Sequence, residues 1–183
     1  MQISKTRKIV TLAMLTAICY LLALLIRISI IPSADFLDFS PSDVPVAIAA
    51  FLFGPLASVL VAVAEAFLEG ITFSTTGLIG AVMNAVSTAS YAAVAGLVYQ
   101  KQKNIRGAIT GLIVGTLLMT GMMLLWNYWL TPIYRGIPRD AVASMLPTVF
   151  LPFNLIKGGI NSVLTFLVYK PVSRFVKQSH QTV

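Results

Sequence analysis

Long stretches without a charged residue are the feature that most limits how this chain can fold. They cover residues 9–26, 44–64, 70–100 and 107–134. A helix needs roughly 20 apolar residues to cross the hydrocarbon core of a bilayer, and several of these stretches meet or approach that length. Only 10% of the 183 residues are charged, whereas a soluble domain usually carries about 25%. The chain is therefore predicted to be an integral membrane protein whose solvent is lipid.

Basic residues explain the formal net charge of +7, and they gather at the two termini and in one short segment, 101–106. This distribution is the positive-inside bias of membrane proteins, in which Lys and Arg accumulate in cytoplasmic segments. Because this bias accounts for the positive net charge, no nucleic-acid partner is expected. The single cysteine, Cys19, lies inside the first apolar stretch, so neither a disulfide framework nor a cysteine-based metal site is expected.

Prolines and acidic residues mark where the apolar stretches break. Most of the nine prolines fall at or near the ends of apolar stretches, where a missing backbone N–H costs little. An acidic loop is expected over 35–43 and a second loop over 131–148. We expect four of the helices over residues 8–31, 77–99, 107–130 and 150–174.

The positions of the basic clusters decide how many helices lie in 44–69, because each further crossing moves all later segments to the other side of the membrane. We call this argument charge parity. If this segment is one span, the basic segment 101–106 lies on the opposite side of the membrane from the N-terminus. If the chain instead turns at Gly54-Pro55, giving short helices 43–53 and 55–69, both termini and that segment face the cytoplasm. The second arrangement satisfies the positive-inside rule at every basic cluster. We therefore predict an all-α, six-helix membrane bundle, a single domain over 1–183, with both termini cytoplasmic.

The segment 43–53 is the weak point of this arrangement, because it makes only about 16 Å of helix and a bilayer core is about 30 Å thick. We expect it to be re-entrant or partly buried together with the helix that follows. The same topology places Asn104 on the cytoplasmic side and Ser33 and Ile137 on the outside of a cell membrane that the chain crosses several times.

Polar side chains inside the expected last helix indicate a binding cavity. Asn154, Lys157 and Asn161 are spaced i, i+3, i+7 and so share one helical face. An ammonium near the centre of a spanning helix costs about 2.5–3.5 kcal/mol, which favours a face turned toward a wet cavity. The alternative is that the aliphatic part of the Lys157 side chain stays in the apolar region while its ammonium reaches the outer membrane–water interface. The two amides on its face favour the cavity.

Further candidates lie on the preceding helices. Asn84 belongs to a polar face of 77–99, which hydrogen bonds between helices and contact with a ligand explain equally well. Asn127 lies near the outer end of 107–130 among aromatic residues; an aromatic belt explains the rings better than it explains the amide. Glu65 and Glu69 are one turn apart. Exposure at the interface is expected for Glu69, while Glu65 fits either the interface or the interior.

Signatures of enzymes are missing from the sequence. There is no Gly-x-x-x-x-Gly-Lys-Ser/Thr loop for phosphates and no His-Glu-x-x-His pair for zinc. The only histidine, His180, lies in the basic tail. Asp35, Asp38 and Asp43 are all expected in an outer loop, so no aspartyl site within the membrane is predicted. We expect the chain not to be an enzyme.

Several short motifs carry a resemblance. They are Asp38-Phe-Ser with Ser42-Asp-Val-Pro45, Phe53-Gly-Pro55, Asn127-Tyr128 and Leu151-Pro-Phe-Asn-Leu-Ile-Lys-Gly158. With these motifs the chain resembles, over nearly its whole length, the S components of energy-coupling-factor (ECF) vitamin transporters, particularly the riboflavin-specific type. The last motif is the most specific of the four.

The resemblance implies a subunit that binds one vitamin from outside, under the outer loops, and works with a membrane coupling T subunit and two ATPase subunits. It implies that Ala13 and Ala17, a small-xxx-small pair on the first helix, dock on the T subunit. No metal and no cofactor apart from the transported vitamin is expected. The predicted vitamin contacts are Asn127, Asn154 and Lys157, which match pocket residues of riboflavin binders, together with Asn161, Asn84, Phe39 and Glu65.

Two departures from the riboflavin type bear on the ligand. Pro41-Ser42 is inserted in a motif that usually reads Asp-Phe-Ser-Asp-Val-Pro, and Glu65-Ala66 stands where that type tends to carry Lys-Asn. A reversal of charge near the mouth of the pocket changes which ligands fit. Riboflavin is the first choice; pyridoxine, hydroxymethylpyrimidine and pantothenate are the alternatives, and an intramembrane enzyme is a remote one.

Overall fold

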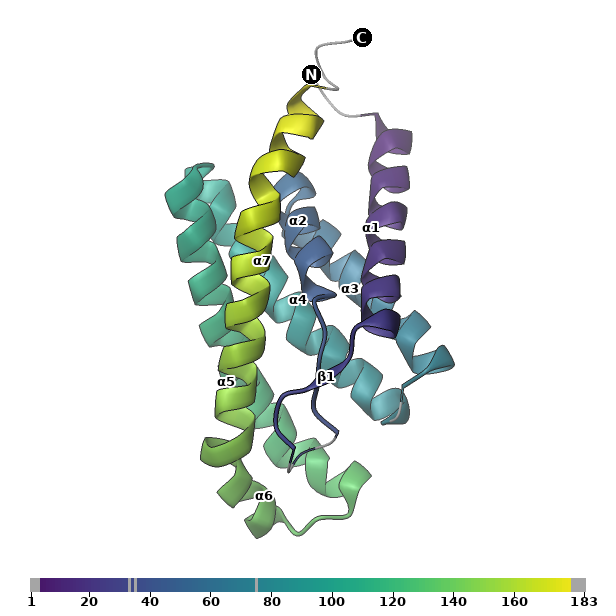
Figure 1. Cartoon of the computed structure of the whole chain (residues 1–183), viewed down its shortest axis with the longest axis vertical. Coiled ribbons are helices and arrows are strands. Elements are labelled where there is room, and N and C mark those ends of the chain that lie inside the picture. Colours follow the sequence, from purple (N-terminus) through teal and green to yellow (C-terminus); the bar gives the residue numbers. More distant parts are fainter. Residues whose placement is uncertain (1–3, 33, 35, 75, 179–183) are drawn as a thin grey trace.

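The computed structural model describes residues 4–32, 34, 36–74 and 76–178, with side-chain surroundings up to Tyr169. Ser33, Asp35 and His180 therefore lie outside the described residues. Within this part of the chain the fold is a bundle of helices that run roughly lengthwise (Figure 1). The helices are α1 (Lys5–Leu25), α2 (Asp43–Phe53), α3 (Pro55–Thr72), α4 (Gly77–Gln102), α5 (Ile105–Arg135), the short α6 (Arg139–Met145), a π-helical turn η1 (Leu146–Phe150) and α7 (Leu151–Gln178).

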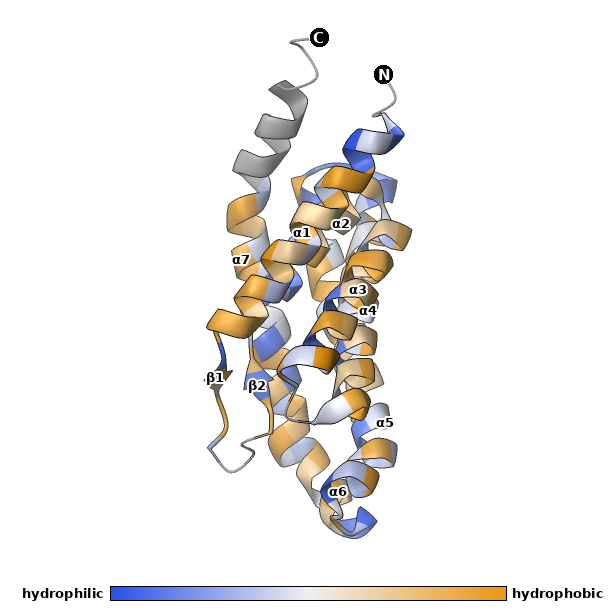
Figure 2. Ribbon diagram, turned by 90° about the vertical axis from the view of Figure 1, so that its right-hand side faces the viewer, coloured by the Kyte–Doolittle hydropathy of each residue, from blue (hydrophilic) through white to orange (hydrophobic). Residues whose placement is uncertain are grey.

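Six helices, α1 to α5 and α7, form the described bundle, as predicted, and the membrane class is confirmed. Five stretches are long and apolar enough to cross a bilayer: Lys5–Leu25, Pro55–Thr72, Gly77–Gln102, Ile105–Arg135 and Arg139–Tyr169. Figure 2 shows apolar residues along the length of the helices and hydrophilic ones at the start of α1 and beside α6.

The turn at Gly54-Pro55 and the bounds 43–53 of α2 are confirmed. Gly54 has a φ of 94°, a left-handed conformation that favours glycine, and Pro55 starts α3, where its missing N–H costs nothing. Helix α2 is eleven residues long, and nine of them, Asp43 to Phe51, are buried. It packs against α1, α3, α4 and α7. Because protein surrounds it, α2 does not need the length of a lipid-spanning helix.

The prediction that the first helix continues to residue 31 was wrong. Helix α1 ends at Leu25, and the chain then forms a two-stranded antiparallel ribbon from β1 (Ile28–Ser29) and β2 (Asp38–Phe39), with Ile28 opposite Phe39. The backbone hydrogen bonds that a longer helix would form within itself are made across this ribbon instead. The all-α description therefore holds for the bundle and not for this connection.

The expected loop over 131–148 was also wrong. Helix α5 continues through Pro132 to Arg135 and ends where Gly136, with a φ of 65°, donates its N–H to the carbonyl of Pro132 at 3.1 Å. A left-handed glycine after the last turn is a common way to end a helix. Helix α6 and η1 then lead directly into α7, so this end of the bundle is helical.

Glycines let α5 lie close to its neighbours. A Cβ on Gly111 would be 2.6 Å from the carbonyl oxygen of Ala95, and one on Gly115 would be 2.5 Å from that of Tyr91, both on α4. On α7, a Cβ on Gly158 would be 2.5 Å from Cγ2 of Thr116 on α5. Small residues at such contacts are what lets helix backbones approach in a membrane. The result is that α4, α5 and α7 present their inner faces to one another.

The three basic regions lie at one end of the bundle. Figure 1 shows the start of α1, the connection from α4 to α5 and the end of α7 at the top, with the ribbon and α6 at the other end. The contacts agree, since Lys8 Nζ lies 6.0 Å from the ring centre of Phe53 and the Tyr99 and Tyr169 hydroxyls form a hydrogen bond. This is the arrangement that charge parity requires. The side of the membrane on which this end lies stays a prediction.

We expect this basic end to face the cytoplasm. Asn104→Cys and Ile137→Cys, each in a Cys19→Ala background, are treated with a membrane-impermeant maleimide in intact and in permeabilised cells. Ile137→Cys should react in intact cells and Asn104→Cys only after permeabilisation. The opposite pattern would show that the bundle is inserted the other way round.

Candidate functional site

A cleft opens at the ribbon end of the bundle and is the candidate site. Its empty space, which includes open solvent at the mouth, is about 730 Å³. The ribbon, α3, α4, α5 and α7 all contribute to its walls. The lining residues are Arg27, Phe36, Leu37, Asp38, Glu69, Ser74, Thr76, Gly80, Met83, Asn84, Ser87, Met123, Asn127, Tyr134, Phe153, Asn154 and Lys157.

Four of the predicted contact residues are brought together in this cleft: Asn84, Asn127, Asn154 and Lys157. Asn127 and Asn154 are each anchored on their own helix. The Nδ2 of Asn127 donates to the carbonyl of Met123 at 2.7 Å, and that of Asn154 donates to the carbonyl of Phe150 at 2.7 Å. The anchoring fixes the direction in which each amide faces the cleft.

Three predicted residues do not line the cleft. Phe39 is buried on β2, whereas its neighbours Leu37 and Asp38 do line it. Asn161 lies one turn further along α7 and donates from Nδ2 to the carbonyl of Ser40 at 3.3 Å. Glu65 is only 2% exposed, and its Oε1 has no hydrogen-bond partner among the described residues. Their roles as vitamin contacts stay predictions, which the geometry does not favour.

Lys157 forms a buried ion pair with Asp43. Its Nζ lies 3.4 Å from Asp43 Oδ2, and the side chains are 9% and 1% exposed. Thr88 donates to the other carboxylate oxygen at 2.7 Å, and Asn161 donates to Oδ2 at 3.1 Å. Lys157 is thus held inside the bundle, and the alternative that it extends to the outer interface is excluded.

Asp43 was expected in an outer loop, and this was wrong. It is the first residue of α2 and is fully buried. The first turn of a helix presents backbone N–H groups and a partial positive charge, both of which favour a carboxylate. The Lys157 ammonium supplies the compensating charge that a buried carboxylate needs. In this chain the acidic residue that begins the apolar helix α2 therefore belongs to a buried ion pair and not to a solvated loop.

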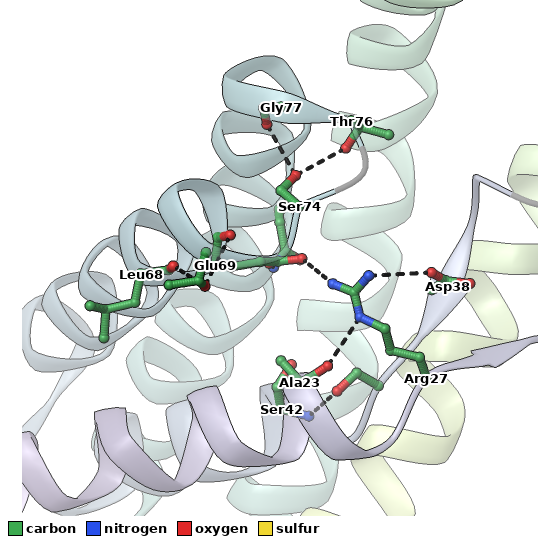
Figure 3. A network of polar contacts seen from close by, with 12 residues as sticks. Ala23, Arg27, Asp38, Ser42, Leu68, Glu69, Ser74, Thr76 and Gly77 are labelled. Atoms are coloured by element: carbon green, nitrogen blue, oxygen red, sulfur yellow. Dashed lines mark hydrogen bonds and ion pairs between the residues drawn. The ribbon is translucent and has the colours of Figure 1, made fainter.

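A second polar network lies at the mouth of the cleft (Figure 3). The Nη2 of Arg27 donates to Glu69 Oε1 at 2.9 Å, and its Nη1 lies 3.7 Å from Asp38 Oδ2. Asn84 donates from Nδ2 to Glu69 Oε2 at 2.7 Å. The expected exposure of Glu69 at the membrane interface was wrong, because Arg27 and Asn84 draw its carboxylate inward; its side chain is 15% exposed.

The two networks meet at Asn84, whose Oδ1 accepts a hydrogen bond from Lys157 Nζ at 3.5 Å. Arg27 was not among the predicted site residues. Its only sequence signal is that it ends the first apolar stretch. A smaller pocket adjoins this region and is lined by Ala23, Arg27, Asp38, Ser40, Ser42, Glu69, Asn84 and Lys157. It gives the cleft a polar side chamber.

No group of three or more His, Cys, Asp or Glu side chains that could hold a metal ion occurs among the described residues. The polar groups of the cleft are amides, hydroxyls and paired charges. Such a set can bind an organic ligand by hydrogen bonds.

The chain that forms this site matches a known family of membrane transport components. The family described as "ECF transporter, substrate-specific component" matches residues 7–169, and the chain is a member of that family. It shares 32% identity with the riboflavin transporter RibU of Staphylococcus aureus (strain TCH60), over 97% of this chain and 96% of that protein. The riboflavin transporter FmnP of Bacillus subtilis (strain 168) is 29% identical, over 95% of this chain and 96% of that protein.

A solved structure agrees with this membership. It is described as "Structure and mechanism of the S component of a bacterial ECF transporter" and shares 30% sequence identity with this chain, with a TM-score of 0.81. The similarity covers 95% of this chain and 99% of that one. The resemblance seen in the motifs is therefore confirmed. The chain is a multi-pass protein of the cell membrane and a transporter component, not an enzyme; its family implies a small substrate, a T subunit and ATPase partners.

The buried pair yields a prediction that is independent of any ligand. Removing one partner of a buried ion pair costs about 3–5 kcal/mol, so Lys157→Met should lower the thermal midpoint of the purified, ligand-free protein by several degrees. The double variant Lys157→Met/Asp43→Asn should recover part of the loss, because no uncompensated charge remains. Lys101→Met, at the exposed end of α4, is the control. If the double variant loses as much as both single variants combined, the pair is not coupled.

Proposed function

We propose that this protein is the riboflavin-binding S component of an ECF transporter, taking up riboflavin together with a T subunit and two ATPase subunits. The observation that carries the proposal is one cleft that combines Asn84, Asn127, Asn154 and Lys157 with aromatic and methionine walls. Relatives that match this chain over nearly its whole length are riboflavin transporters, which supports the same ligand.

The chemistry of the cleft suits a flavin ring. Such a ring offers carbonyl oxygens and ring nitrogens along one polar edge, while its other edge and its two faces are apolar. An amide both donates and accepts hydrogen bonds, and an ammonium donates three. Phe36, Tyr134 and Phe153 supply flat apolar surface in the same cleft. A few fixed polar groups in an apolar slot are the usual way in which a pocket selects an organic ligand.

The charges of the site favour an uncharged ligand. Arg27 is engaged by Asp38 and Glu69, and Lys157 by Asp43. Pantothenate carries a carboxylate and would have to compete with these acidic groups for a cation. Riboflavin is uncharged at neutral pH, and the side chamber with Ser40 and Ser42 suits the hydroxyls of its ribityl chain.

Identification of the bound ligand tests the proposal directly. The protein is purified in mild detergent from cells grown with riboflavin and then denatured, and the released small molecule is identified by absorbance and mass. We expect a yellow preparation that releases riboflavin. Release of another vitamin, or failure of the ligand-free protein to quench riboflavin fluorescence on mixing, would contradict the assignment.

The surface for the T subunit is proposed on α1. Ala13 and Ala17 are exposed, and the large apolar side chains of Met14, Ile18 and Leu21 are exposed on the same helix. Small residues allow the backbone of another helix to approach closely. An apolar face with two alanines therefore fits a helix of the T subunit.

Bulky replacements should separate docking from binding. Ala13→Trp combined with Ala17→Trp should keep riboflavin affinity within about threefold, because the cleft lies elsewhere, and should abolish copurification with the T subunit and uptake into cells. Ala64→Trp, on the exposed face of α3, is the control and should leave uptake intact. If the double variant loses riboflavin binding as well, this face packs inside the protein and the proposed surface is wrong.

A further inference from the structure

Glu69 receives hydrogen bonds from two sides of the cleft, and neither partner belongs to its own helix. Arg27 reaches Oε1 from the connection between α1 and the ribbon, at 2.9 Å. Asn84 reaches Oε2 from α4, at 2.7 Å. One carboxylate on α3 thus joins Arg27, at the base of the ribbon (Figure 3), to Asn84 in the wall of the cleft.

Arg27 attaches the base of the ribbon to the bundle. It precedes β1 directly, its Nη1 lies 3.7 Å from Asp38 on β2, and its Nε donates to the carbonyl of Ala23 on α1 at 3.1 Å. Its guanidinium also lies over the ring of Phe73, 4.5 Å from the centroid. The ribbon contributes residues 36 to 38 to the cleft lining. Because the same guanidinium reaches Glu69 on α3 and Asp38 on β2, the Arg27–Glu69 contact ties α3 to a segment that lines the site.

Glu69 also determines which way the Asn84 amide faces. Because Nδ2 is held by Glu69, Oδ1 is turned toward Lys157 Nζ, 3.5 Å away. The flipped amide would place two donor groups against each other at Lys157 and leave a carbonyl against the Glu69 carboxylate. The assignment thus follows from the hydrogen-bond network as a whole. Glu69 thus holds one of the polar groups of the cleft in a defined orientation.

We propose that Glu69 is a positioning residue for ligand binding: it fastens the ribbon to the cleft wall and orients Asn84, so the ligand leaves after the Arg27–Glu69 contact opens. The proposal rests on the proposed function only in that the ligand is a vitamin bound in this cleft. Its kinetic consequence is specific. Loss of Glu69 speeds dissociation, while association, which starts from an open ribbon, changes little. A residue that only stabilises the fold would lower the fraction of active protein and leave both rate constants of that fraction unchanged.

A double-mutant cycle on the fastening pair measures this consequence. Glu69→Gln, Arg27→Gln and their combination are compared with the parent by stopped-flow quenching of riboflavin fluorescence. Each single variant should dissociate about tenfold faster, as expected for the loss of one charge-assisted hydrogen bond, with association within about threefold. The combination should be no faster than the faster single variant. Multiplicative effects, or an unchanged dissociation rate, would overturn the proposal.

Asp140→Asn is the matched control, because it makes the same acid-to-amide change at an exposed position of α6, at the ribbon end of the molecule. It should leave both rate constants unchanged. Should Glu69→Gln not fold, Arg27→Gln opens the same contact from the ribbon side and carries the kinetic test alone.

A second readout needs no vitamin. Met83 lines the cleft and is 6% exposed, so Met83→Cys in a Cys19→Ala background reports how often the ribbon opens. Glu69→Gln should raise its reaction rate with a small methanethiosulfonate severalfold, and Asp140→Asn should not. Equal rates with and without Glu69 would refute the fastening role. If the protein binds a vitamin other than riboflavin, this labelling result still stands, so failure of the proposed function and failure of this inference are distinguishable.

Discussion

The pairing of Lys157 with Asp43 is the interaction on which the rest of the site depends. In a bilayer interior a lone charge of either sign is costly. Here Lys157 and Asp43 are each other's partners, and Thr88 and Asn161 donate hydrogen bonds to the carboxylate. The pair joins the start of α2 to the second turn of α7. Because α2 is short and begins inside the bundle, the segment before it has room to form the ribbon and to line the cleft. A full-length second helix would fill that space with side chains.

Close helix contacts bring the other polar groups of the cleft within reach of one ligand. The backbones of α4 and α5 meet at Gly111 and Gly115, and α5 meets α7 at Gly158. Helices that approach this closely present Asn84, Asn127 and Asn154 to a common space. In lipid these contacts cannot rely on the hydrophobic effect, so packing of small residues and hydrogen bonds between helices must supply the attraction. The same contacts therefore stabilise the bundle and assemble the site.

Local patterns predicted a large part of this arrangement. The helical period placed Asn154 and Lys157 on one face, and charge parity with Gly54-Pro55 located the short α2. The missed features all depend on tertiary contacts. Arg27 and Glu69 are 42 residues apart in sequence, and neither side chain has a local pattern that identifies the other. The end of α1 was misplaced for the same reason, because the pairing of β1 with β2 ends the helix and its own apolar sequence does not.

Below the cleft, side chains of several helices meet in the interior of the bundle. The Tyr91 hydroxyl and Ser162 Oγ lie 3.1 Å apart, and Ser162 is also hydrogen-bonded to Thr116. Further toward the basic end, the rings of Phe51, Tyr99 and Tyr169 pack against one another. The cleft that the described residues form therefore has its mouth at the ribbon end. A chain built in this way has the architecture of a binding protein. This agrees with a family in which one component selects the substrate and separate ATPase subunits supply the energy.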